Sequence, residues 1–87
     1  MDKHYHSCVL AVRCHYVGGK LLEALYPDRG QQAMHQAMEE ALELGAQAFH
    51  GHAPLADVPQ LFAEEEQLVA RWEEGWRLAS KPTVRRG

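Results

Sequence analysis

The stretch from residue 57 to 79 constrains the fold most, because it reads as one amphipathic helix that carries both tryptophans. Its apolar residues recur at steps of three and four, and most of its glutamates fall on the opposite side. Asp57 and Gln60 are spaced as a capping box, and Pro59 is tolerated in a first helical turn. The apolar residues are Leu61, Phe62, Leu68, Val69, Trp72, Trp76 and Ala79. We therefore expect a helix over residues 57–80.

A second helix is indicated over residues 31–50, after the turn sequence Pro27-Asp28-Arg29-Gly30. Asp28 and Gln31 offer a capping pair for it. Its apolar stripe consists of Met34, Ala37, Met38, Ala41, Gly45, Ala48 and Phe49. Only the short segment 50–56 separates this helix from the next one, so we expect the two to form an antiparallel C-terminal hairpin.

Residues 7–26 are compatible with either strand or helix. Val9, Val12 and Val17 favour a strand, with Gly18-Gly19 as a turn. The helical alternative rests on a second set of residues, which step at three to four positions, and on a glycine pair that would let another helix approach closely. That set is Cys8, Val12, His15, Gly19, Leu22 and Tyr26. We favour the helix.

The 87 residues are enough for one domain, which we place at residues 1–80. Residues 1–6 read as a frayed start, and 81–87 as a flexible basic tail because Pro82 cannot continue a helix. The expected fold is an all-α domain of three helices. A chain this small often completes its core by pairing with a second copy, so a homodimer is expected.

The two cysteines and the first residues of the chain indicate where the protein is located in the cell. Cys8 and Cys14 do not make a disulfide framework, so we read both as reduced thiols. The first six residues are polar, which is unlike a signal peptide, and no run approaches the eighteen apolar residues of a membrane span. These features indicate a cytoplasmic protein that does not cross a membrane.

No stretch spells out a reaction or a cofactor. The six histidines include the pairs His4-x-His6 and His50-x-His52, but they lack the close-spaced ligand sets of zinc sites, so no metal is expected. Phosphate-binding loops and the common nucleophile and metalloprotease motifs are missing, which favours a protein that is not an enzyme and needs no cofactor. Cys14 is expected to be buried and inert.

Charged residues suggest internal contacts rather than catalysis. The paired glutamates read as a solvated helix face, except that Glu65 shares the side of the apolar stripe. We expect its carboxylate to pair with Arg13 or Lys20.

Trp72 and Trp76 lie one turn apart on one side of the last predicted helix. At least one indole is expected in the core, and the other is a candidate anchor for a partner, because aromatic residues and arginine dominate binding energy at interfaces. The candidate partner-binding residues are Leu61, Leu68, Arg71, Trp72 and Trp76.

The sequence Trp72-x-x-Gly75-Trp76-Arg77-x-Ala79 resembles the W-x-x-G-W-x-x-A signature of ribosome modulation factor and its small relatives. Upstream, Gly45-x-Gln47-Ala48 and Pro59 are similar to the helix, connector and proline of that family. The resemblance covers about residues 41–80, and it implies two helices joined by a loop and a role on ribosomal RNA. The chain departs from the family in its net charge of −3 and in its additional N-terminal third.

Two functions follow as expectations. The first is a small bacterial regulatory protein without catalytic activity, which lays an apolar helix face on a protein and blocks its activity or assembly, as an antiactivator of a transcription regulator does. The alternative, implied by the resemblance, is a ribosome-associated hibernation-type factor. The net negative charge argues against general nucleic-acid binding. The candidate RNA-contacting residues are Arg77, Lys81, Arg85 and Arg86.

Overall fold

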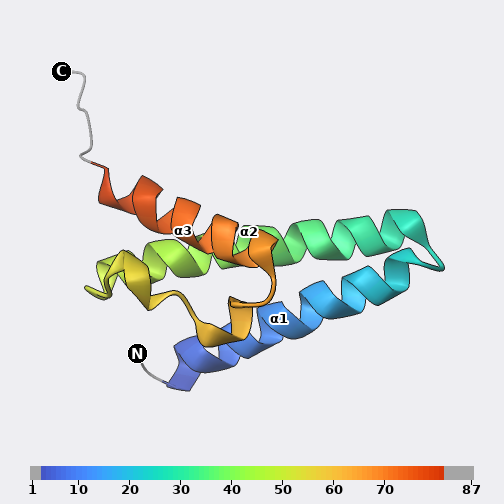
Figure 1. Ribbon diagram of the computed structural model, residues 1–87, viewed down its shortest axis with the longest axis horizontal. Helices are drawn as coiled ribbons and strands as arrows, with labels where there is room; N and C mark the ends of the chain where they lie inside the picture. The colour runs from blue at the N-terminus through green and yellow to red at the C-terminus, as the bar shows by residue number, and fades with distance from the viewer. Residues whose placement is uncertain (1–2, 82–87) are drawn as a thin grey trace.

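The structure is a computed structural model that describes residues 3–81, and within that range it contains three α-helices and no strand (Figure 1). The helices are α1 (Lys3–Glu23), α2 (Pro27–His50) and α3 (Glu66–Ser80), and two short 3₁₀ turns, η1 (Leu55–Asp57) and η2 (Gln60–Phe62), lie in the connector before α3. The predicted all-α, three-helix fold is confirmed, and residues 7–23 of the ambiguous segment 7–26 are helical rather than extended. None of the helices in residues 3–81 is both long and apolar enough to cross a membrane.

Helices α1 and α2 form an antiparallel hairpin that is closed at one end by a tight turn. The amide of Tyr26 donates to the carbonyl of Leu22 at 2.7 Å, and the turn leads directly into α2 at Pro27. The helices touch near Gly19, where an added Cβ would lie 2.8 Å from Met34 Cγ, whereas a Cβ on Gly18 would meet nothing within 4 Å. Gly19 alone of the glycine pair therefore provides the predicted close approach.

Helices α2 and α3 run in the same direction, so the predicted antiparallel C-terminal hairpin is wrong (Figure 1). Arg71, near the start of α3, shares a surface cleft with Met38, and Trp76, further along, packs on Phe49 at the end of α2. The connector explains the difference, since residues 51–65 are long enough to carry the chain back beside the middle of α2 before α3 begins.

The predicted helix over residues 57–80 is wrong in its first part, because α3 begins only at Glu66. Val58 and Pro59 have extended backbones, with ψ of 137° and 134°, and the residue before a proline disfavours the helical conformation. The turn that follows buries the Phe62 side chain completely. Tertiary burial of one aromatic ring thus outweighs the helical pattern of the connector, and Asp57 lies in η1 rather than capping α3.

The other helix ends also differ from prediction. Helix α1 begins at Lys3, so the expected frayed start is wrong for residues 3–6, and it ends at Glu23 rather than residue 26. Helix α2 begins at Pro27, four residues early, because proline suits the first helical position, where its missing N–H leaves no hydrogen bond unmade. Of the predicted basic tail, only Lys81 is described; residues 82–87 lie outside the described range.

The core lies on both sides of α2. The buried apolar residues are Val9, Val12 and Tyr16 from α1, Ala37, Ala41, Leu44 and Ala48 from α2, Phe62 from the connector, and Leu68 and Trp72 from α3. The inner side of α1 follows Val9, Val12, Tyr16 and Gly19, so the predicted stripe through Cys8, His15 and Tyr26 is wrong by about one residue. Small alanines on α2 allow both neighbouring helices to approach its backbone.

Two glycines set the distance between α2 and α3. A Cβ built on Gly45 would overlap the carbonyl oxygen of Trp72, and a Cβ built on Gly75 would overlap the carbonyl oxygen of Leu42. Each helix therefore places a glycine against the backbone of the other. Any side chain at either position would force the helices apart.

Candidate protein-binding surface

Two of the predicted contact residues of α3 are used inside the chain. Leu68 and Trp72 are 0% exposed, and Trp72 Nε1 donates a hydrogen bond to the Tyr5 hydroxyl on α1, 2.9 Å away. A buried indole N–H requires such a partner. A second protein would reach these side chains only if the surrounding helices opened. Leu68 and Trp72 are therefore core residues and not the exposed partner-binding residues that were predicted.

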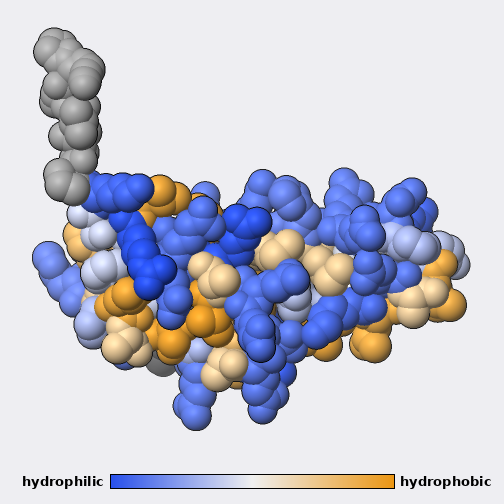
Figure 2. Space-filling view, turned by 45° about the horizontal axis from the view of Figure 1, so that its top comes forward, coloured by the Kyte–Doolittle hydropathy of each residue, from blue (hydrophilic) through white to orange (hydrophobic). Residues whose placement is uncertain are grey.

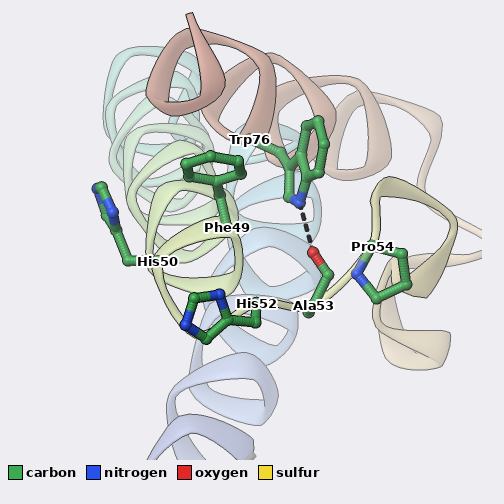
Figure 3. Close-up of a pocket in the computed structure, with 6 residues that line it drawn as sticks. All are labelled: Phe49, His50, His52, Ala53, Pro54 and Trp76. Carbon is green, nitrogen blue, oxygen red and sulfur yellow. Dashed lines mark hydrogen bonds between the residues drawn. The ribbon is translucent and has the colours of Figure 1, made fainter. Parts of the chain in front are cut away.

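Trp76 is partly exposed and connects α3 to the segment after α2 by a hydrogen bond (Figure 3). Its Nε1 donates to the carbonyl oxygen of Ala53 at 2.8 Å, and its ring meets Phe49 edge-on at a centroid distance of 5.2 Å. It lines an open pocket of about 380 Å³, together with Phe49, His50, His52, Ala53 and Pro54. Trp76 therefore has a structural role at the end of α2, with part of its ring facing that pocket.

The end of α2 holds a histidine where glycine is the usual residue. His52 has a positive φ of 69°, and the amides of His52 and Ala53 donate to the carbonyls of Phe49 and Ala48. These two bonds make a Schellman motif, in which the left-handed residue is usually glycine because a Cβ is unfavourable there. The ring of His52 lies at the pocket beside Trp76 (Figure 3).

The remaining predicted contact residues lie apart from one another. Leu61 is partly buried in the connector, while Arg71 on α3 donates to Glu74 one turn along, at 3.1 Å. Arg77 and Lys81 are both exposed at the end of α3. Arg85 and Arg86 lie outside the described residues. The structure therefore does not gather the predicted set into one exposed face.

Four of the five large apolar side chains that are exposed in residues 3–81 lie instead on α1 and at its junction with α2, and the fifth, Leu78, lies on α3. Leu21 is 71% exposed, Leu25 76%, Tyr26 54% and Leu10 49%. Figure 2 shows apolar residues at the end of the molecule where α1 and α2 join. We define the α1 outer face as Leu10, Cys14, Val17 and Leu21, and the apolar end as Leu25 and Tyr26. Isolated exposed leucines are ordinary, but several gathered along one helix and its end make a candidate interaction surface.

Sequence reasoning missed this surface although the signal was present. The α1 residues step at three to four positions twice, once through Val9, Val12 and Tyr16 and once through the outer face. A helix that is apolar on two sides needs cover on both. The prediction used one stripe only, and it placed Cys14 in the core, whereas Cys14 is an exposed free thiol.

The charges beside the outer face are paired within the chain. Lys20 Nζ lies 2.9 Å from Glu65 Oε1, which confirms the predicted contact of Glu65, and this hydrogen bond raises the pKa of Lys20. Arg13 donates to the carbonyl oxygen of Leu61 at 2.6 Å and lies 3.8 Å from the Glu64 carboxylate. The outer face itself carries no charged side chain. Its flank is therefore close to neutral, despite two basic residues.

Two tyrosines tie the inner side of α1 to α3. Burial raises the pKa of Tyr5 above its ordinary value, and although the Trp72 hydrogen bond acts in the opposite direction, the charge of Asp57 adds to the rise. Burial also raises the pKa of Tyr16, whose hydroxyl donates to Gln67 Oε1 at 3.2 Å. The inner side of α1 is thus held by both apolar packing and polar contacts.

The histidines are spread over the surface. All six are exposed, and in residues 3–81 no three His, Cys, Asp or Glu side chains are gathered as a metal site requires. Cys8 Sγ lies 3.7 Å from His4 Nε2, one turn away on α1.

Comparisons of the chain with models of known protein families, with curated proteins and with solved structures find no match. The resemblance to ribosome modulation factor therefore rests on the sequence motifs within about residues 41–80 and stays a prediction.

Proposed function

We propose that this chain is a small, cytoplasmic bacterial regulatory protein without catalytic activity, which binds another protein through the α1 outer face and the apolar end. By covering the site that the partner needs for activity or assembly, it acts as an inhibitor of the antiactivator type. The supporting observation is the exposure of Leu21 near the end of α1 and of Leu25 and Tyr26 in the turn that follows it, while the inner side of α1 is already packed.

Burial of these side chains would supply the driving force for binding. Burying an exposed leucine contributes roughly 1.5–3 kcal/mol, and a pre-formed surface lowers the entropic cost that this contribution has to offset. Helix α1 is held rigidly by its inner side through Val9, Val12 and Tyr16, which lowers the entropic cost of presenting the outer face. The proposal keeps the predicted mode of action but moves it from α3 to α1.

The test is affinity purification from the native host with three tagged forms: the wild type, the double variant Leu21→Ser/Leu25→Ser, and Leu78→Ser as control. Leu78 is 49% exposed on α3 and lies outside the proposed surface. A true partner should be enriched by the wild type and the control, and depleted at least about tenfold with the double variant. Equal recovery with all three forms would show that the surface is wrong.

A ribosome-associated role is the second candidate, favoured by the exposure of Arg77 in the last turn of α3 and of Lys81 directly after the helix. Arg77 lies within the tryptophan motif that carries the family resemblance, and Lys81 follows it. The test is co-sedimentation with ribosomes at rising salt, with Arg77→Gln and Lys81→Gln. Each lost phosphate contact should reduce the slope of log affinity against log salt by roughly 0.7–0.9. Binding that is absent at low salt would eliminate this candidate.

A further inference from the structure

We infer that, in the absence of a partner, a second copy of the chain covers the α1 outer face, paired antiparallel along Leu10, Cys14, Val17 and Leu21. This inference deepens the proposed function and rests on it in one respect, since self-association and partner binding would use the same residues. It assigns the face to an identical helix, and three features of the structure support that choice.

The first feature is the spacing of the outer face. Its four residues follow one another at intervals of four, three and four, which is the repeat of a two-helix coiled-coil seam. Leu10, Cys14 and Leu21 are exposed and Val17 is partly buried on the side of α1 that points away from its packed inner side, and α1 runs along one edge of the molecule (Figure 1). A second helix therefore has access along the length of the seam.

The second feature is the charge of this face. The seam residues are uncharged, and the two cations on its flank, Arg13 and Lys20, already contact Glu64 and Glu65. A strongly charged partner would find no counter-charge here. An identical neutral face is complementary to itself, and an isologous contact of this kind closes as a dimer.

The third feature fixes the direction of pairing. The interval pattern four-three-four is the same when read backwards, so a two-fold axis places Leu10 opposite Leu21 of the second copy and Cys14 opposite Val17 of the second copy. Antiparallel pairing also opposes the two helix dipoles. It sets Arg13 opposite Gly18 of the second copy rather than beside a second Arg13. A parallel pair would instead bring the two Cys14 residues together.

Sedimentation of the purified wild-type protein over a range of concentrations is the first measurement. We expect a reversible dimer with a dissociation constant of roughly micromolar order, because a single helix pair buries less than a standard interface. Leu21→Ser should raise that constant at least about tenfold, while Leu78→Ser leaves it unchanged. A wild-type protein that stays monomeric throughout would overturn the inference.

Crosslinking tests the direction. In a Cys8→Ser background, the added substitution Val17→Cys should give a covalent dimer rapidly under mild oxidation, because positions 14 and 17 face each other across the seam. The Cys8→Ser protein alone, with Cys14 as its one thiol, should link slowly. Equal rates for the two proteins would overturn the antiparallel arrangement.

The two proposals fail separately. A monomeric protein whose Leu21→Ser/Leu25→Ser variant still loses its host partner would eliminate the second copy and leave the proposed function in place. A dimer whose outer-face variants recover the partner as well as the wild type would leave the inference in place and eliminate the proposed function.

Discussion

Helices α1 and α3 are both packed against α2, but they differ in what remains uncovered. The apolar stripe of α3 is closed: Leu68 and Trp72 are buried, both indole N–H groups are bonded within the chain, and Gly75 lies against the backbone of α2. Helix α1 buries one side and leaves a second apolar side in solvent. Both tryptophans therefore contribute to the fold, whereas Leu10 and Leu21 on α1 stay exposed.

The difference teaches how to read aromatic pairs in small proteins. Two tryptophans in 87 residues suggest a binding site, because large aromatics dominate interface energetics. Here one tryptophan, Trp72, is completely buried, and Phe62 from the connector belongs to the same buried cluster. Large aromatic side chains that contribute strongly to interfaces contribute equally to the core of a small protein, which has few large residues to fill it.

The largest expected effect is on the free energy of unfolding, which should fall much more for a substitution on α3 than for one on α1. Trp72→Ala should lower the free energy of unfolding by about 3–5 kcal/mol, because it removes a fully buried indole and leaves a cavity. Leu21→Ser should change it by less than about 0.5 kcal/mol, since the side chain is mostly in solvent. Urea unfolding of both variants measures this. Comparable losses would mean that the α1 outer face is part of the core.

Two glycine-to-alanine substitutions, one on α3 and one on α1, test the same comparison by adding a single methyl group to each helix. Gly75→Ala should destabilise the protein by about 1–3 kcal/mol, because the new Cβ meets the Leu42 carbonyl and the helices must separate. Gly18→Ala on α1 meets no atom and should stabilise by about 1 kcal/mol through helix propensity. Thermal melts of the two variants, followed by circular dichroism, should shift in opposite directions. Shifts of the same sign would contradict the close contact of α2 and α3.

A smaller effect is expected at the end of α2. His52→Gly should stabilise the protein by up to about 1 kcal/mol, because it relieves a left-handed residue while increasing the freedom of the unfolded chain. His50→Gly, two residues earlier and helical, should instead cost about 1 kcal/mol. Urea midpoints of the two variants provide the measurement. A loss of stability in both would show that the His52 ring contributes contacts that outweigh its backbone strain.

The smallest effect concerns the polar contacts between α1 and α3. The pKa values of Tyr5, Tyr16 and Lys20 are all raised in the folded protein. Above about pH 10 the unfolded chain loses these protons first, so the folded state binds more protons and its stability falls as the pH rises. Urea midpoints measured from pH 8 upwards should be level at first and then decline. Tyr16→Phe should make the decline shallower, and a midpoint that rises with pH would contradict the direction of these shifts.

The sequence by itself determined the helical class, the separation of three helices, and much of the core. Those features depend on local signals: periodicity of apolar residues, the break before Pro27, and glycines at contact positions. A contact of Glu65 with Arg13 or Lys20 was also predicted, because an acid on an apolar helix stripe needs a basic partner, and the structure shows that the partner is Lys20. These conclusions follow from neighbours along the chain or from the chemistry of one residue.

Only the tertiary structure decided the direction of α3, the start of that helix and the location of the exposed face. The connector could return along α2 or turn back sharply, and the choice depends on burying Phe62 between helices rather than on local propensity. Likewise, α1 carries two apolar stripes, and the sequence does not show which one meets α2. The buried stripe is the one that contains Tyr16 and Gly19, and Gly19 allows α2 to approach closely. The other stripe, with Leu10 and Leu21, stays in solvent.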